Sequence, residues 1–346
     1  MTSEHANKVT LTVGDAIHEG WTDASISLNM DHLAGAFRLS LTEEYLHNGT
    51  LLQRPVKAGA ACRLAIDGVV VLTGWVDSHN PSYDAGSRSV SVSGRAKAGD
   101  LVDCSAEVKE YLKQKIDTIA ADLCAPFGID VHIIGDMGAA FERVAVNTGD
   151  TVHATLDRLC RQRGLLAWSD GLGNLVLGRG TAGQAVAELV RGRNVLSASA
   201  TDDFTGRFSK IVMRGTKETP DNSDAAAASQ EEGIATDDAI GRPRPKIMVA
   251  ETQGGTATLT QRAEHEMRVS QGKSRTAEAT VQGWHHGNGL WLPRQTVTFN
   301  DDWLGIDGDF VISNVELSKS DSGTTAKLTL NPPTTFDILA EAGDGQ

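Results

Sequence analysis

One pattern of residues occurs twice, once near each end of the chain, and it limits the fold more than any other feature. Ile66-Asp67-Gly68 is followed by an apolar run, a polar loop and an alternating run at 89–92, and Ile306-Asp307-Gly308 is followed by the same succession, ending at 326–330. An Asp-Gly pair between two apolar runs predicts a hairpin, because both central residues of a type I′ turn need positive φ. The chain is therefore expected to contain two similar β-domains. Chance recurrence is the alternative, since such hairpins are common in β-proteins.

The N-terminal part of the chain has the pattern of half-buried strands. Short runs alternate apolar with polar residues, as a strand with one buried face must. These runs lie at 9–13, 25–28, 37–41, 62–66 and 89–93. Short strands with turn signals at this density are typical of a small barrel or sandwich. We expect residues 1–95 to form a first small β-barrel domain.

The apolar period then changes from two residues to three or four. Between residues 108 and 127 the spacing predicts one helix, ended by Pro126 and Gly128. A second helix is expected over about 150–163, with Gly164 as its stop, and a hairpin follows around Asp170-Gly171. Residues 96–180 are therefore predicted to be an α/β insert of two helices plus a hairpin.

The remainder divides by composition. Residues 181–215 are predicted as connecting strands, and acidic and small residues dominate 216–245, which predicts an acidic mobile loop. Residues 246–346 contain one helical pattern at about 259–271 and several strand patterns, so they are predicted to form a second β-barrel domain with one helix. The fold class expected for the whole chain is α+β and multidomain, with two similar β-barrels.

Charge and cysteine content exclude several classes of protein. A formal net charge of −13 at pH 7 argues against a nucleic-acid scaffold, which needs clustered Lys and Arg. The four cysteines form no Cys-x-x-Cys pair, so a zinc ribbon or redox motif is not indicated, and reduced structural thiols are expected. The N-terminus lacks a signal-peptide core, and no apolar run has the length of a membrane helix. We expect synthesis in a cytoplasm and no stable membrane association.

Motifs that could carry chemistry are weak. Gly178-x-Gly180-x-x-Gly183 is followed by a weakly helical stretch at 184–191, but it lacks the βαβ context of a dinucleotide site. His285 and His286 are weak metal-ligand candidates without a clear third ligand. No catalytic constellation and no cofactor site is predicted. A paired-carboxylate hydrolase stays an alternative, because the chain has 45 acidic residues, although nothing in the sequence singles out a pair.

Several strings, in order along the chain, carry a family resemblance. The longest runs from Ser93 to Ser105 and reads Ser-Gly-Arg-Ala-Lys-Ala-Gly-Asp-Leu-Val-Asp-Cys-Ser; others lie at 125–129, 149–151, 281–284 and 289–293. Together they resemble the Mu-like contractile phage baseplate hub, the tail P protein family. The resemblance extends over essentially the whole chain and is weakest at 216–241.

The resemblance implies a structural, non-enzymatic protein of the virion tail baseplate, assembled in the host bacterial cytoplasm. It implies a homotrimer whose two β-domains per chain form a pseudo-sixfold ring, with the tail tube protein on one side and the central spike protein on the other. Further baseplate proteins are implied as partners, and DNA only in transit through the channel. The alternatives are a tail-tip cell-wall hydrolase and a glycan-binding adsorption protein.

The string near residue 100 is expected to mark a junction between domains. Gly94 would end a strand, Arg95 and Lys97 would pair with Asp100 or Asp103, and Leu101 and Val102 would fill the bottom of the barrel. Such pairs fix orientation more than they add stability. The alternative is a surface turn with solvated charges. The residues of this signature are Gly94, Arg95, Lys97, Asp100, Leu101, Asp103 and Cys104.

Overall fold

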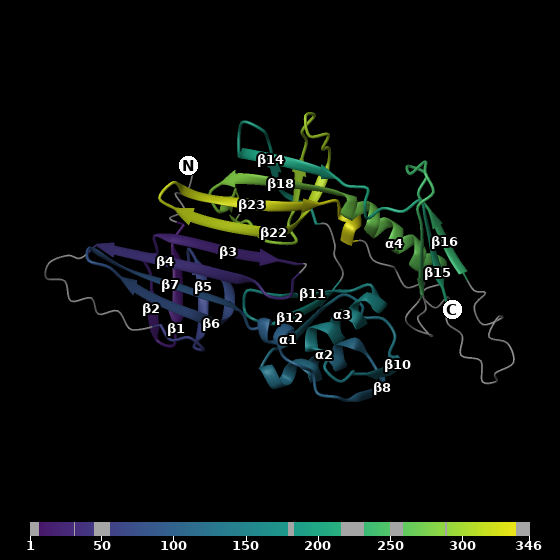
Figure 1. Ribbon diagram of the computed structural model, residues 1–346, viewed down its shortest axis with the longest axis horizontal. Coiled ribbons are helices and arrows are strands. Elements are labelled where there is room, and N and C mark those ends of the chain that lie inside the picture. The colour runs from purple at the N-terminus through teal and green to yellow at the C-terminus, as the bar shows by residue number, and fades with distance from the viewer. Residues whose placement is uncertain are drawn as a thin grey trace.

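The computed structural model describes residues 7–30, 32–44, 56–178, 183–215, 232–249, 259–287 and 289–336. Strands predominate, and four units can be distinguished (Figure 1). A first β unit, purple and blue, lies beside a second β unit, green and yellow. An α/β unit lies below them, and a small sheet with a long helix extends to one side.

The first β unit contains the strands that the sequence predicted and one short strand, Ala16–His18, that it did not. Its inward positions are fully buried, as at Ile26, Leu39 and Leu64. The Asp-Gly turn is present as expected, with positive φ at Asp67 (48°) and Gly68 (84°). The strands are β1 (Val9–Val13), β2 (Ala16–His18), β3 (Asp23–Asn29), β4 (Ala36–Glu44), β5 (Ala61–Ile66), β6 (Val69–Tyr83) and β7 (Ser87–Ala96).

The second β unit is assembled from distant parts of the chain. Residues 184–191, predicted as weakly helical, contain a strand instead, because they pair with a later strand of the sheet. The strands are β13 (Ala185–Leu189), β14 (Val195–Asp202), β18 (Arg275–Gln282), β21 (Thr296–Phe299), β22 (Asp309–Ser320) and β23 (Gly323–Asn331). A short hairpin of β19 (His285–His286) and β20 (Gly289–Leu290) leaves the end of β18.

The second Asp-Gly pair does not form the predicted tight turn. The chain between β21 and β22 turns at 302–305, where a bridge between Asp301 and Ile306 closes the loop. The Asp301 carboxylate accepts the backbone N–H groups of Trp303 and Leu304 at 2.9 and 3.1 Å, which stabilises this longer turn. Residues 307–308 therefore lead into β22 rather than forming a hairpin turn.

The two β units form one continuous sheet and have the same strand order. Reading across the sheet, β14-β18-β23-β22 is followed by β3-β4-β7-β6, with β22 and β3 paired antiparallel at the joint. After their long strands, the units continue with β21-β13 and β5-β1 respectively. The correspondence ends at the last pair, since β1 is antiparallel to β5 but β13 is parallel to β21. A single hydrophobic cluster includes residues of both units.

Each long strand also carries one extra residue at the same place in its ladder, Asp77 in β6 and Ser313 in β22. Arg95 donates to Asp77 at 2.9 Å, and Ser313 donates to Asn331 at 2.9 Å. Arg95 and Asn331 occupy corresponding positions, each opposite the residue two places before the bulge. The match of bulge and side-chain partner indicates that the two units are repeats of one design.

The α/β unit departs from prediction at its start. The apolar spacing predicted one helix from 108 to 127, but residues 110–114 form a strand, and the helix begins at Ile116. Val108 and Leu112 are more than half exposed, whereas Tyr111 is buried and donates its hydroxyl to Asp122 at 2.6 Å. The elements are α1 (Gly99–Asp103), β8 (Glu110–Gln114), α2 (Ile116–Cys124), η1 (Ala125–Phe127), β9 (Val131–Ile134), β10 (Phe141–Ala145), α3 (Val152–Arg163), β11 (Leu166–Ser169) and β12 (Leu175–Gly178).

A fourth unit corrects the prediction of an acidic loop over 216–245. Residues 216–231 lie outside the described residues, but 232–236 and 245–249 form strands on either side of β15. Their alternate residues pack on a helix with a small core of Ile211, Met213, Ala235, Ala263 and Met267. The unit consists of β15 (Lys210–Arg214), β16 (Glu232–Thr236), β17 (Pro245–Val249) and α4 (Leu259–Ser274); η2 (Pro333–Phe336) packs against α4.

Candidate assembly surfaces and domain junctions

Arg95 links the first β unit to the α/β unit. Its Nε donates to Asp77 in β6 at 2.9 Å, and its Nη2 donates to Asp103 at the end of α1 at 2.7 Å. The guanidinium holds the pKa of Asp103 below its ordinary value, chiefly through this hydrogen bond. Side chains of the three residues are 40–53 % exposed, so solvent screens the pairs. The geometry therefore fixes an orientation more than it adds stability.

Other signature residues have varied surroundings. A Cβ on Gly94 would lie 2.2 Å from the Trp75 carbonyl oxygen, so this strand crossing requires glycine. Lys97 donates to the Gly128 carbonyl at 3.4 Å, and Leu101 is fully buried in the α/β core rather than at the bottom of a barrel. Val102 is 38 % exposed, so the prediction that it fills the barrel is wrong.

The remaining two signature residues, Asp100 and Cys104, contribute through the backbone. The Asp100 carbonyl accepts the N–H of Cys104, and the Cys104 carbonyl accepts the N–H of Val152 at the start of α3. The Cys104 side chain is exposed. Backbone bonds thus tie α1 to α3.

A second junction, which the sequence did not indicate, joins the α/β unit to the second β unit. The guanidinium of Arg294 lies over the ring of Trp168 at 3.9 Å. Arg294 has φ 71°, which is unusual for a residue with a side chain, and its N–H donates to the Ile312 carbonyl at 2.8 Å. All three larger units border a cavity of about 220 Å³ beside this contact. No spacing rule predicts such a pair, because its residues are far apart in sequence.

His285 and His286 do not point at a common site. His286 is buried, and its ring lies tilted against that of Trp291 with the centroids 4.9 Å apart. It lies 3.2 Å from the Gln295 amide nitrogen, and its burial lowers its pKa. His285 Nε2 lies 3.5 Å from Asp67 Oδ2 in the turn of the first β unit. Among the described residues, no group of three or more His, Cys, Asp or Glu side chains is arranged to hold a metal ion.

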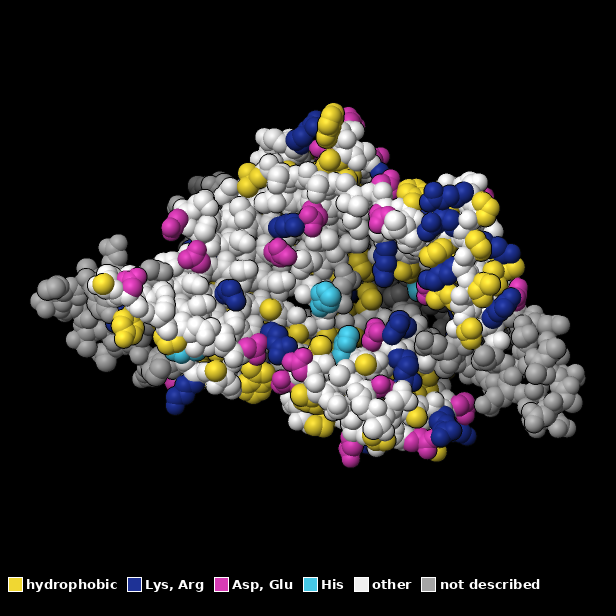
Figure 2. All heavy atoms as spheres, viewed as in Figure 1, with side chains coloured by type: hydrophobic (Ala, Val, Ile, Leu, Met, Phe, Trp, Pro, Cys, Tyr) yellow, Lys and Arg dark blue, Asp and Glu magenta, His cyan; other side chains and the backbone are white. Residues whose placement is uncertain are grey.

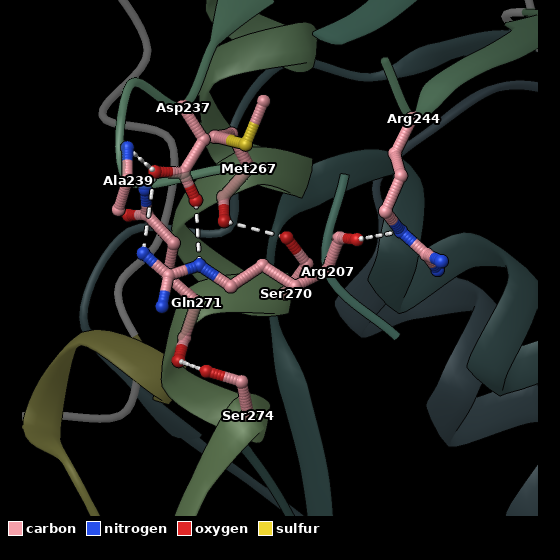
Figure 3. A network of polar contacts seen from close by, with 8 residues as sticks. All are labelled: Arg207, Asp237, Ala239, Arg244, Met267, Ser270, Gln271 and Ser274. Atoms are coloured by element: carbon pink, nitrogen blue, oxygen red, sulfur yellow. Dashed lines mark hydrogen bonds and ion pairs between the residues drawn. The ribbon is translucent and has the colours of Figure 1, made fainter. Parts of the chain in front are cut away.

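The fourth unit is held together by a buried ion pair (Figure 3). Arg207 Nε donates to Asp237 at 2.6 Å and its Nη2 at 3.2 Å, and the two side chains are only 16 % and 4 % exposed. Asp237 also accepts the Ala239 N–H at 3.1 Å. The Arg207 hydrogen bond is the main cause of the lowered pKa of Asp237, and Gln271 of α4 contributes. The pair thus joins the segment before β15 to the end of β16, and Gln271 connects it to α4.

The outer face of this small sheet combines exposed apolar and basic side chains. Ile234 and Ile247 flank Val212 on neighbouring strands and are 43 % and 57 % exposed. Lys210 and Arg214 are exposed on the same strand as Val212. Figure 2 shows Lys and Arg gathered with hydrophobic side chains over this part of the molecule. On a chain of net charge −13, this face is a candidate partner surface.

Several strand edges lack a neighbour among the described residues, and those of β14 and of the far end of β6 are two of them. β14 pairs only with β18, and most of its residues are exposed. β6 pairs with β5 only up to Trp75, and Val76 still exchanges backbone hydrogen bonds with Gly59 and Ala60. The outer edge of its distal half, residues 78–83, is open. Unpaired backbone N–H and C=O groups on an edge are a template for another strand. Both edges are therefore candidate assembly surfaces.

Three family models match successive parts of the chain. Residues 8–96 match the family described as Mu phage baseplate assembly protein GpP-like, N-terminal. Residues 98–179 match Baseplate hub protein gp44-like, second domain, and residues 255–339 match Mu phage baseplate assembly protein GpP, fourth domain. The baseplate hub protein gp44 of Escherichia phage Mu is 32% identical over 349 residues, which cover 97% of this chain and 91% of that protein. The chain belongs to the Mu-like phage baseplate hub family.

Solved structures agree with this membership. The 43 kDa tail protein of prophage MuSo2 from Shewanella oneidensis has a TM-score of 0.84 and 36% identity, covering 96% of the hub chain and 99% of that protein. A tail protein from Neisseria meningitidis MC58 has a TM-score of 0.82 and 26% identity, with 95% and 97% covered. The hub is thus a phage tail baseplate protein. In its described residues, no helix combines the length and apolar character needed to span a bilayer.

Proposed function

We propose that the hub acts as a homotrimer that forms a pseudo-sixfold ring between the tail tube and the central spike of a contractile tail, and encloses the channel through which DNA leaves. In this proposal each β unit closes as a barrel, and the domains divide near residues 95 and 180. The protein has a structural role without catalysis, and assembles in the host cytoplasm. Membership of the baseplate hub family supports the location in the virion tail.

The observation that carries the proposal is the repeated strand order. The two β units share the order of six strands and the position of one bulge, and they join edge to edge through β22 and β3. If each joint in a ring repeats this one, three chains provide six similar units around one axis. In the run of eight strands from β14 to β6, the outermost strands are β14 and β6. Each has a free edge, which in β6 is limited to the distal half.

Charge supports the proposed channel and partners. A net charge of −13 favours passage of DNA without adhesion. The basic and apolar outer face of β15–β17 differs in sign from the whole chain, so we propose that it binds an acidic surface of another baseplate protein. Arg95 is proposed to fix the α/β unit relative to the ring through Asp77 and Asp103.

The test is the mass and symmetry of the purified protein. Light scattering at several concentrations is expected to give a species of three times 36.7 kDa, and averaged electron micrographs are expected to show a ring with six similar lobes. A chain that stays monomeric at all concentrations and shows no ring contradicts the proposal. Incubation with cell-wall sacculi is expected to cause no loss of turbidity; a loss would favour the hydrolase alternative.

A further inference from the structure

We propose that neighbouring chains of the ring join by pairing the distal half of β6 with β14 of the partner subunit, in the register that β22 and β3 use within one chain. The inference rests on the proposed ring and adds its joint. The evidence is the correspondence between the two β units, which can be followed residue by residue.

The long strands give the first half of the register. The bulge residues Asp77 and Ser313 correspond, so counting outward from each places Ser82 of β6 at the position of Ser318 in β22. Ser318 lies opposite Ser25 of β3 within the chain. Ser82 is exposed on the open edge of β6. The edge that β22 uses for β3 is therefore the edge that β6 leaves free.

The other side of the joint is found in the same way. Strands β14, β18 and β23 of the second unit correspond to β3, β4 and β7 of the first. Ala277 of β18 and Phe37 of β4 correspond, because they pair with corresponding residues of β23 and β7. Ala277 also pairs with Ala200 of β14, and Phe37 pairs with Ile26 of β3, so Ala200 corresponds to Ile26. The residue before each is a serine, Ser199 and Ser25. β14 and β3 can therefore be aligned here residue by residue, without an insertion or deletion.

The register of the joint follows directly. Ser82 lies opposite Ser199 of the partner subunit, as Ser318 lies opposite Ser25 within the chain. His79 then lies opposite Asp202 of the partner subunit, which places a basic side chain beside a carboxylate. Such pairing converts exposed backbone groups of both edges into ladder hydrogen bonds.

A loop beside β14 supplies an anchor for the same joint. Trp303, 84 % exposed, lies in the turn between β21 and β22, and the buried Asp301 carboxylate fixes the backbone of this turn. Arg191, just before β14, approaches Asp301 at 3.8 Å, and Arg275, opposite Asp202 at the other end of β14, donates to the Gly305 carbonyl. The turn is therefore held by side chains that lie next to the two ends of β14.

The first β unit shows what this turn contacts. The turn at Asp67 in the first unit corresponds to the turn with Trp303 in the second unit. Within one chain, Asp67 Oδ2 lies 3.5 Å from His285 Nε2 of the second unit. In the ring, the turn with Trp303 faces the first unit of the partner subunit in the corresponding way. An exposed tryptophan on a fixed backbone is the usual form of an interface anchor. The joint therefore has an apolar contact as well as a strand ladder.

The joint between chains differs from the joint within one chain in strength. Pro81 takes the place of Leu317, so one backbone N–H is missing from the edge of β6. Opposite it, Ala200 replaces the larger Ile26. Fewer hydrogen bonds and less apolar contact make the ring open between chains before the two β units of one chain separate.

Cysteine pairs test the register. Ser82→Cys with Ser199→Cys is expected to give disulfide-linked species of two and three chains on a non-reducing gel, because both side chains lie on the same outer face. Ser318→Cys with Ser25→Cys is the matched pair within one chain and is expected to close without linking chains. Ser82→Cys with Ala200→Cys shifts the pair by one residue, to opposite faces, and is expected to stay unlinked. Each single variant controls for disulfides through the exposed Cys104.

The outcomes separate the joint from the ring. A trimer by light scattering in which the matched inter-chain pair fails to cross-link overturns the joint and leaves the ring intact. A monomer at all concentrations overturns both. Cross-linking of the shifted pair, but not the matched pair, overturns the register.

Truncation of the anchor gives a second measurement. Trp303→Ala is expected to raise the dissociation constant of the trimer at least about thirtyfold. Leu112→Ala removes an exposed apolar side chain of the α/β unit, outside the joint, and is expected to leave the constant within about threefold. Equal effects of the two variants overturn the role of Trp303.

Discussion

Removal of the Asp237 carboxylate is expected to unfold the fourth unit while leaving the large sheet intact. In Asp237→Ala the Arg207 guanidinium loses both hydrogen bonds, and with a side chain only 16 % exposed it has little access to replacement water. The Ala239 N–H loses its acceptor as well. Breaking a buried pair on one side typically costs about 3–5 kcal/mol, because a buried charge remains unpaired. The small core of this unit contains few side chains that could offset the loss.

The same pair predicts a pH dependence. The folded unit holds the pKa of Asp237 below its ordinary value, so the unfolded chain binds the proton more readily. The stabilisation is therefore fully present above the unfolded-state pKa of aspartate, about 3.9, and is lost as the pH falls through the lower folded-state value. In Asp237→Ala this part of the acid dependence is expected to disappear.

Native-state hydrogen exchange measures the effect locally, since the whole chain is too large for one unfolding transition to report on one unit. Protection of the β15 and β16 amides is expected to fall more than a hundredfold in Asp237→Ala, with little change in β6 and β22. Glu232→Ala is the control, because its partner Arg214 is 47 % exposed and such pairs contribute less than about 1 kcal/mol. Equal losses of protection in the two variants would refute the assignment of stability to burial of the pair.

Three further outcomes are expected. Gly94→Ala should lower the melting temperature strongly, because the new Cβ would lie 2.2 Å from a backbone oxygen; an unchanged melting curve contradicts the close crossing. Asp103→Ala should leave the urea midpoint almost unchanged, because Asp77 still binds Arg95 and solvent screens the pair; a clear fall of the midpoint would show that the screened pair was underestimated. Titration with a thiol reagent at neutral pH should modify Cys104 alone in the native protein and all four thiols after denaturation. The other three thiols, Cys62, Cys124 and Cys160, are buried, and burial raises the pKa of each to about 12, so they do not react in the folded protein.

Alternation was a reliable guide to the large sheet. Runs such as 9–13 and 62–66 have one buried face each. An apolar period of two residues fits a strand and not a helix. Helix α3 was also predictable, since Thr151 accepts the Ala154 N–H at its start and Gly164 ends it with positive φ. In these segments local preference and tertiary burial agree.

The wrong predictions concern segments in which local preference and tertiary burial disagree. Leu112 fits an apolar helical stripe, yet the chain buries its neighbour Tyr111 and leaves Leu112 exposed. Strands β16 and β17 are short and expose apolar residues, so they lack a clear alternation of buried apolar and exposed polar residues; their pairing with β15 makes them strands. For the site, the pairing of Arg95 with a carboxylate was within reach of sequence, whereas the contact of Arg294 with Trp168 depends on the packing of distant segments.

The ladder between β22 and β3 also has a mechanical consequence. It spans the paired residues from Asn314 to Lys319, and its hydrogen bonds run across the strands. A force directed along the strands loads all these bonds at once, so they must break together rather than one after another. The two β units of a chain therefore resist sliding past each other along the strands, and a force applied to one unit is transmitted to the other through the backbone hydrogen bonds of this ladder.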